Sequence, residues 1–184
     1  MNTQQDTDQV MIDIETLSTH PNAAILSIGA VLFNIKTQKI TGQFEIAIRM
    51  QSSSSYGHIS PETVSWWMQR PEQARQEATK GEEHTILGAL NHLEYWIKQN
   101  CDPKTVKIWS KSPAFDLVIL ASAYRRFNKK PPWHYHNELD VRTAFHYAKT
   151  ILNKVPKASL PEDKKHIALE DAHIQAKQIM EIYA

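Results

Sequence analysis

The sequence predicts an α/β domain in which a mixed central β-sheet is flanked by α-helices. Three observations favour this class. Short β-branched and apolar runs dominate the first 48 residues, strand and helix patterns alternate afterwards, and 184 residues suit one compact domain. Hydrophobic residues at 41% and charged residues at 22% are typical of globular proteins, so disordered, coiled-coil and collagen-like chains are excluded.

Three strands are expected near the N-terminus, after a polar leader at residues 1–9. The run 10–14 is β-branched, and residues 24–33 and 43–48 are further strand candidates, with a turn at 37–39. The serine-rich segment 51–57 is predicted to be a loop. Residues 10–184 are then expected to form a single domain.

Capping signals predict the helices that follow. Residues 60–62 combine an N-cap serine, a proline at the first helical position and an acid in the first turn, which predicts a helix through Gln69. Pro71 restarts a short helix. Thr85 caps the next one, whose apolar residues recur on one face: Ile86, Leu90, Leu93 and Ile97.

The second half of the chain alternates strands and helices. Asp140 is expected to cap one of these helices. The expected elements are a strand at 105–109, a helix at 115–127, an edge strand at 133–136, a helix from Asp140 to about Lys149, a charged loop at 150–165 and a helix at 168–182.

Charge and cysteine content limit the setting of the protein. The formal net charge is +1, but the two halves of the sequence differ. Residues 1–92 hold 6 basic and 10 acidic residues, whereas residues 93–184 hold 15 basic and 10 acidic residues, so the first half is acidic and the second half is basic. Cys101 is the single cysteine, which excludes an internal disulfide and a cysteine zinc site and favours a reducing, cytoplasmic setting. We expect no export signal and no membrane segment.

Two acids stand close together on the first expected strand. Because strand side chains alternate, Asp13 and Glu15 point to one face, about 7 Å apart, while Ile12 and Ile14 enter the core. Two such carboxylates repel each other unless a cation lies between them. The alternative is a solvated face at a sheet edge.

Further candidates for the same site lie after the fourth strand and before the last helix. Asp116 falls in the first turn of a helix, where capping is the ordinary role. His166 and Asp171 converge only if His166 lies on the loop before the helix, since five residues of continuous helix turn by about 500°. A surface position is the alternative for His166. Glu170 points away from Asp171.

Four carboxylates without cysteine favour a hard cation, Mg²⁺ or Mn²⁺. Such clusters commonly hold two metal ions that act together in phosphoryl transfer, and a histidine is the natural base for the attacking water. If these residues meet in space, the sequence predicts a metal-dependent phosphodiesterase.

The same residues resemble a known family. Asp13-x-Glu15, Phe115-Asp116 and His166-x₄-Asp171 resemble the three motifs of the DEDDh branch of the DnaQ-like 3′-to-5′ exonucleases, across residues 10–180. Further matches at residues 13–23, 63–67 and 109–116 resemble its small stand-alone branch, which includes phage exodeoxyribonuclease A and related bacterial exoribonucleases. Many members of that branch have Gly-Asn where this chain has Ser110-Lys111.

The resemblance implies an RNase H-like fold and two divalent ions, Mg²⁺ or Mn²⁺. Asp13 would bridge both ions, Glu15 and Asp171 would complete the site of one, Asp116 would serve the other, and His166 would be the general base. The substrate would be a single-stranded DNA or RNA 3′ end, released as nucleoside 5′-monophosphates. Expected substrate contacts are Thr16, Leu17, Phe115, Trp66 and Trp67, with one tryptophan in the core and the other facing the substrate.

Several alternatives stay open at this level. The sequence does not distinguish DNA from RNA. A proofreading subunit of a polymerase is one alternative function, although such subunits usually carry a C-terminal binding segment that we do not expect here. A non-catalytic nucleic-acid-binding module is another, and it predicts missing ligands where all five residues are present. No residue identifies a homodimer interface.

Overall fold

The structure is a computed structural model, which describes residues 8–184. Its strands are β1 (Asp8–Thr16), β2 (Ile25–Asn34), β3 (Lys39–Ala47), β4 (Lys107–Ser110) and β5 (Glu138–Asp140). They form one sheet in the order β3-β2-β1-β4-β5, in which β1, β2 and β3 pair antiparallel and β4 and β5 continue parallel to β1. The predicted mixed sheet is confirmed.

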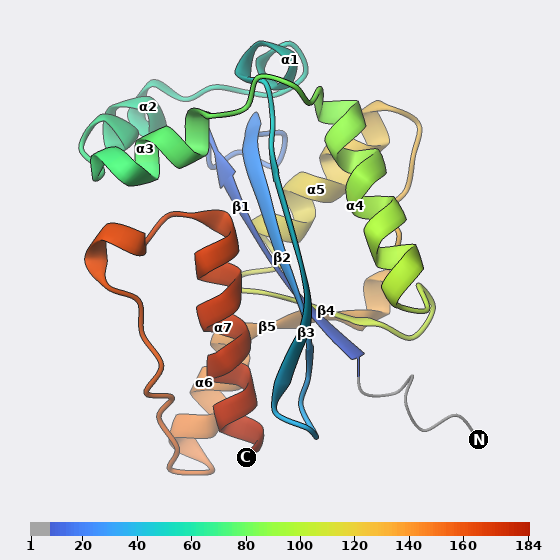
Figure 1. Cartoon of the computed structure of the whole chain (residues 1–184), viewed down its shortest axis with the longest axis vertical. Helices are drawn as coiled ribbons and strands as arrows, with labels where there is room; N and C mark the ends of the chain where they lie inside the picture. Colours follow the sequence, from blue (N-terminus) through green and yellow to red (C-terminus); the bar gives the residue numbers. More distant parts are fainter. Residues whose placement is uncertain (1–7) are drawn as a thin grey trace.

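Helices lie on both faces of this sheet (Figure 1). They are α1 (Met50–Ser54), α2 (Pro61–Met68), α3 (Glu72–Thr79), α4 (Ile86–Asn100), α5 (Asp116–Arg126), α6 (Val141–Thr150) and α7 (Ala168–Tyr183), with short 3₁₀ turns η2 (Tyr135–Asn137) and η3 (Glu162–Lys164). Ser60, Thr85 and Asp140 cap α2, α4 and α6 through their side-chain oxygens, as predicted.

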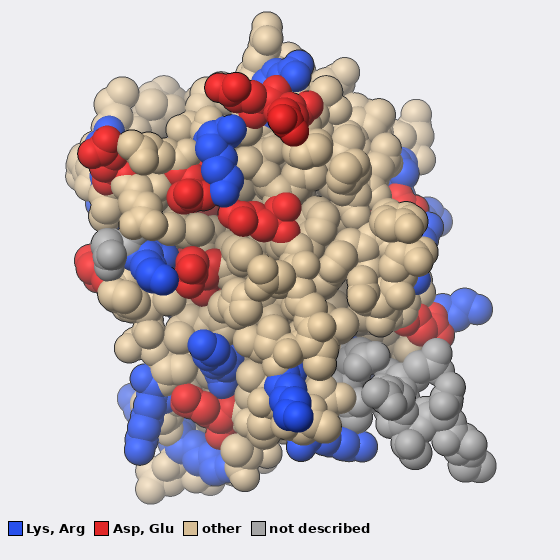
Figure 2. Space-filling model, in the orientation of Figure 1, with Lys and Arg blue, Asp and Glu red and all other residues tan. Residues whose placement is uncertain are grey.

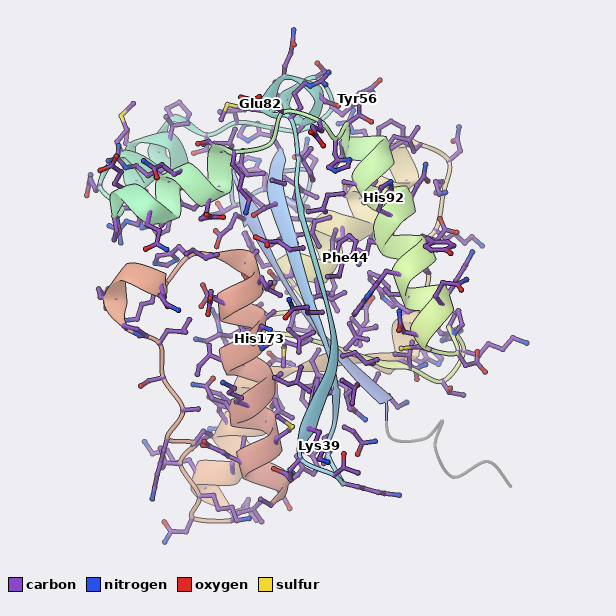
Figure 3. The ribbon with its side chains drawn as sticks, viewed as in Figure 1. Lys39, Phe44, Tyr56, Glu82, His92 and His173 are labelled. Carbon is purple, nitrogen blue, oxygen red and sulfur yellow. The ribbon has the colours of Figure 1, made fainter. Side chains whose placement is uncertain are left out.

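The two faces of the sheet have separate cores. Even-numbered residues of β1 pack with α4 and α5, whereas Met11 packs with α6 and α7. β3 shows the same alternation: Phe44 packs against Trp96 of α4 with ring centroids 5.7 Å apart, while Gln43 lies 3.0 Å from the His173 ring nitrogen on α7 (Figure 3). The sheet is therefore buried on both faces at its centre.

A smaller core lies beneath α2 and α3, beside the C-terminal end of β1. It contains Leu17, Ala24, Leu26, Trp67, Ala74 and Ala78. The indole Nε1 of Trp67 donates to the Thr16 carbonyl over 2.9 Å. This contact ties α2 to the end of β1.

Two of the expected elements differ from the structure. The predicted edge strand at 133–136 is wrong: these residues enter η2, in which the His134 imidazole accepts from the His136 amide over 3.3 Å, and the edge strand follows as β5. The predicted loop at 51–57 contains α1, whose amides from Ser53 onward bond back to Arg49 and later carbonyls. Both errors concern short elements that tertiary contacts stabilise.

The N-terminal boundary also differs from the expectation. β1 begins at Asp8, so the leader at 1–9 is too long by at least two residues, and its residues 1–7 lie outside the described part of the chain. Gln9 is buried, and its carboxamide oxygen accepts from the Trp109 indole over 2.6 Å. Within residues 8–184, no helix combines the length and the apolar character that a bilayer crossing requires.

Candidate active site

Asp13 and Glu15 occupy the α7 face of β1, near its C-terminal end. The Asp13 carboxylate accepts from the Gln175 side-chain amide of α7 over 2.8 Å, while Ile12 and Ile14 are buried in the opposite core. Strand alternation therefore places both carboxylates as predicted. Glu15 is buried, so neither acid forms part of an ordinary solvated face.

Asp116 reaches the same place through an open edge of β1. β4 pairs with β1 only at residues 9–11, so the β1 edge beyond Met11 is not covered by β4. The Ile14 amide on that edge donates to the Asp116 Oδ1 over 3.3 Å. Asp116 is only 4% exposed. The turn after β4 thus brings the first residue of α5 against the strand that carries the other two acids.

His166 lies on the loop before α7, which is the condition for it to meet Asp171. Its φ of 63° reverses the chain, and its backbone amide donates to the Asp171 Oδ2 over 2.7 Å. Ligand atoms of Glu15, His166 and Asp171 all lie within 4.8 Å of one another. The structure therefore brings all five predicted catalytic residues together.

A glycine on β2 permits α7 to come this close to the sheet. Gly29 pairs with Asp13 across the β1–β2 ladder. A Cβ atom at Gly29 would lie 2.3 Å from the Ala168 carbonyl carbon and the Leu169 amide nitrogen. The first turn of α7 therefore rests directly on the β2 backbone, beside Asp13.

Burial raises the pKa of every acid in the cluster, and repulsion between carboxylates adds to it at Asp13 and Glu15. Burial is the main cause for Asp13 and Glu15, with the neighbouring carboxylates adding to it. Burial raises the pKa of Asp116 to about 7, against the opposing effects of the Ile14 amide, the Ser110 hydroxyl and Arg142. Burial also raises the pKa of Asp171. The cluster resists carrying its full negative charge unless a cation neutralises it.

The donor set fits divalent cations. Among the described residues, none of the four acids forms an ion pair with a lysine or arginine. The Gln175 Oε1, on the side chain that contacts Asp13, is buried without a hydrogen-bond partner. Carboxylate and amide oxygens are the ligands that Mg²⁺ and Mn²⁺ prefer. The site is thus suited to a hard cation and is incompletely satisfied by protein groups alone.

The acids lie in a cleft of about 720 Å³, bordered by β1, α2 and the start of α7. Trp66 and Trp67 both line the cleft, but they differ in exposure, and one of them is buried as expected. Trp67 is 7% exposed and bonded to Thr16, whereas Trp66 is 36% exposed and meets the His166 ring edge-on, with centroids 4.8 Å apart. Trp66 therefore presents its ring to the cleft beside the histidine.

Of the three other expected substrate contacts, two line the cleft and one does not. Thr16 and Phe115 line the cleft. Leu17 is not among the lining residues, because its side chain fills the small core beneath α2 and α3. The structure therefore does not bring the Leu17 side chain to the substrate region.

Four residues near the acids had no predicted role. Gln175 contacts Asp13, Gly29 admits α7, and Lys111 and Arg142 line the cleft as its basic side chains. Gln175 carried a readable signal, because it lies one helical turn after Asp171. Lys111 belongs to the Ser110-Lys111 pair that departs from the family pattern, and its charge lowers the pKa of Asp171.

Solved structures of similar fold include several nucleases. The nuclease domain of 3′hExo, a DEDDh family member, bound to rAMP, has a TM-score of 0.66 at 15% identity, over 98% of this chain and 92% of that one. Cell-death related nuclease 4 (CRN-4) has a TM-score of 0.69 at 12% identity, and the match covers 96% of this chain and 63% of that one. E. coli exonuclease I in complex with a dT13 oligonucleotide has a TM-score of 0.64 at 14% identity, and the match covers 92% of this chain and 39% of that one. The fold is thus RNase H-like, and this chain spans about two fifths of exonuclease I.

No curated protein matches the chain. A family does match, and it is described as the 3′-5′ exoribonuclease Rv2179c-like domain, over residues 8–183. That range includes the four acids of the cluster and the loop that carries His166. The chain belongs to the 3′-5′ exoribonuclease Rv2179c-like family and is a 3′-5′ exonuclease.

Proposed function

We propose that this enzyme removes nucleotides from the 3′ end of single-stranded RNA and releases nucleoside 5′-monophosphates. One observation carries the proposal: four carboxylates with raised pKa values and one imidazole, from three separate parts of the chain, converge in one cleft. The description of the family supports RNA as the substrate. The single cysteine supports a reducing, cytoplasmic setting.

Two divalent ions, Mg²⁺ or Mn²⁺, are the proposed cofactors. Glu15 and Asp171 would hold one ion, Asp116 would hold the other, and Asp13 would bridge them. The proximity of Glu15 and Asp171 ligand atoms, within 4.8 Å, supports a shared ion for that pair. When bound, such ions activate a water molecule and stabilise the charge on the leaving oxygen.

His166 is the proposed general base. Burial lowers the pKa of its imidazole, so the ring is neutral at neutral pH and a ring nitrogen can accept a proton from the attacking water. The edge-on contact with Trp66 restricts the imidazole ring, and the hydrogen bond from the His166 backbone amide to the Asp171 carboxylate restricts the backbone. The proton then passes to solvent, because His166 is only partly buried.

The terminal nucleotide would lie against Trp66, Thr16 and Phe115. Trp66 lines the cleft with a partly exposed ring, over which the Arg70 guanidinium lies at 4.5 Å, and aromatic rings commonly hold unpaired nucleotides. Trp67 acts indirectly, since its bond to the Thr16 carbonyl positions the strand end that borders the cleft. Solved DEDDh exonucleases of this fold bound to rAMP or to a dT13 oligonucleotide support a single-stranded ligand in this cleft.

Digestion of matched single-stranded RNA and DNA, labelled at the 5′ end and incubated with Mg²⁺ or Mn²⁺, tests the proposal. Labelled RNA should shorten one nucleotide at a time, with 5′-mononucleotides as products and slower loss of DNA. Asp13→Asn should reduce the rate at least about a hundredfold, because it removes a carboxylate that would hold the metal ions.

Glu170→Gln is the matched control for this experiment. Glu170 neighbours Asp171 on α7, but it is not among the residues that line the cleft, and its carboxylate lies 3.7 Å from the Lys164 ammonium. This variant should keep the wild-type rate. Undiminished hydrolysis by Asp13→Asn would overturn the assignment of the site, and faster digestion of DNA would overturn the choice of RNA.

A further inference from the structure

A line of polar and basic side chains on α6 starts inside the cleft. Arg142, in the first turn of the helix, lines the cleft with the catalytic acids. His146 and Lys149 follow at intervals of four and three residues, so the three side chains occupy one face of the helix. All three are exposed. We call Arg142, His146 and Lys149 the α6 stripe.

Among the side chains that the structure describes, no acid forms an ion pair with the basic groups of the α6 stripe. Within residues 8–184, neither Arg142 nor Lys149 forms an ion pair, whereas several other lysines do: Lys80, Lys98, Lys129, Lys164 and Lys165. Asp140, next to Arg142, is occupied as the cap of α6 by two backbone amides. The α6 stripe therefore offers charge that an anionic strand can use.

The positions of the residues around the cleft indicate which way a bound strand would leave it. Trp66 and His166 border the cleft on the α2 side, where the terminal nucleotide would lie. Arg142 borders the same cleft as Asp116, from the first turn of α6. The acids therefore separate the terminal-nucleotide end of the cleft from the Arg142 end, and a strand that continues beyond the scissile phosphate has to leave past Arg142.

We propose that the RNA upstream of its 3′-terminal nucleotide runs along α6, with its phosphates held by Arg142 and Lys149. The inference rests on the proposed function, since it extends the same cleft. Arg142 and Lys149 are about 10 Å apart along the helix axis, at 1.5 Å per residue, which accommodates more than one nucleotide. His146, between them, adds a ring nitrogen that can donate to a phosphate oxygen.

The surroundings of the far end of α6 are also basic. Figure 2 shows lysine and arginine side chains gathered on the lower part of the molecule, below and beside the end of α7, and acidic side chains on the upper part. Lys154 and Lys157 follow α6 in the loop that returns to His166. A phosphate chain leaving the cleft along α6 therefore moves toward positive potential rather than away from it.

A second basic pocket is the rival path. It measures about 500 Å³, lies between the end of α4 and the segment 129–134, and includes Lys98, Lys129 and Lys130. Lys98 and Lys129 are both paired with Glu94. None of its lining residues also lines the catalytic cleft. The α6 stripe is favoured because it is continuous with the cleft.

Lys149→Glu tests the proposal when two substrates are compared: a dinucleotide, too short to reach Lys149, and a 12-nucleotide single-stranded RNA without self-complementarity. For the 12-mer, kcat/KM should fall about tenfold through KM, and the slope of its logarithm against that of salt concentration should weaken by about 1. Lys149→Arg should restore both values. The loss should be absent with the dinucleotide.

Lys130→Glu is the matched control, because it reverses an exposed lysine in the rival pocket. It should leave both substrates unaffected. An equal loss on both substrates with Lys149→Glu, or no loss on either, would overturn the α6 path, and a length-dependent loss with Lys130→Glu would favour the rival pocket. A wild-type protein that hydrolyses neither substrate would contradict the proposed function. Fluorescence anisotropy of the labelled 12-mer with wild type and Lys149→Glu would then still test the path.

Discussion

His166 illustrates how a single backbone conformation assembles this site. A positive φ is unfavourable for a residue with a side chain, and it persists here because the His166 amide bonds to Asp171 and the ring packs against Trp66. The same hydrogen bond from the backbone amide holds the Asp171 carboxylate in place. One local reversal of the chain therefore orients both the proposed base and one proposed metal ligand.

His166→Ala should lower the rate of RNA hydrolysis by about 100- to 10,000-fold, the usual contribution of a general base, while Mn²⁺ binding is largely retained. Single-turnover kinetics and titration calorimetry measure the two quantities separately. His173→Ala is the control and should behave as wild type, because His173 lies on α7 and forms a hydrogen bond with Gln43 outside the cleft. Loss of metal binding in His166→Ala would show that His166 is a ligand instead.

At the scale of secondary structure, the site depends on the closeness of α7 to the sheet. Small residues, Ala168, Ala172 and Ala176, line the buried side of this helix, and Gly29 lies under its first turn. Asp171 and Gln175 project from the same helix toward β1. The separation between α7 and β2 therefore sets the distance between Asp171 and the acids of β1.

Gly29→Val should displace the first turn of α7, because even a Cβ atom would lie 2.3 Å from the Ala168 backbone. We expect a loss of about 2–4 kcal/mol in the free energy of unfolding and a large loss of activity. Urea unfolding and RNA hydrolysis measure these effects.

Gly42→Ala is the control for Gly29→Val, since a Cβ atom there would have its nearest neighbour at 3.5 Å. It should change the free energy of unfolding by less than about 1 kcal/mol. A stable, fully active Gly29→Val protein would contradict the close approach of α7.

Over the whole molecule, the sheet gathers like charges that the folded chain cannot neutralise by itself. β1 contributes two acids, and α5 and α7 contribute one each. Burial raises the pKa of all four, and the neighbouring carboxylates raise those of the two β1 acids further. In the unfolded chain these carboxyls return to ordinary pKa values. Folding without metal is therefore opposed at any pH at which the acids must ionise.

The stability of the metal-free protein should fall as pH rises from about 4 to 7. Asp116 ionises near 3.8 when unfolded and at about 7 when folded, so between these values the folded state binds more protons. Mg²⁺ should reverse the trend, because it binds the ionised acids, and should raise Tm more at pH 8 than at pH 5.

Thermal unfolding at a series of pH values, with and without Mg²⁺, measures this dependence. Asp116→Asn should flatten the metal-free curve between pH 4 and 7, since it removes one of the groups that take up a proton. A metal-free Tm that rises with pH over this range would contradict the charged, buried cluster.

The local sequence contains most of the catalytic chemistry. The Asp-x-Glu alternation, the acid that follows the fourth strand and the histidine before the last helix are readable because strand and helix periodicity fixes where side chains point. The caps at Ser60, Thr85 and Asp140 were readable for the same reason, since each acts on backbone two or three residues away. Short elements such as β5 and α1 were not, because neighbours far along the chain stabilise them.

Contacts between distant segments decided the rest. The Ile14 amide meets Asp116 across 102 positions of sequence, and Gln175 meets Asp13 across 162, so no local pattern reveals either pair. Tertiary contacts also decide three other features: the different exposure of Trp66 and Trp67, the position of Leu17 outside the cleft, and the position of Arg142 in the cleft with the acids. Residue types determine what chemistry is available here, whereas the packing of α2, α6 and α7 around β1 determines which side chains share the cleft, because only the folded sheet brings those segments together.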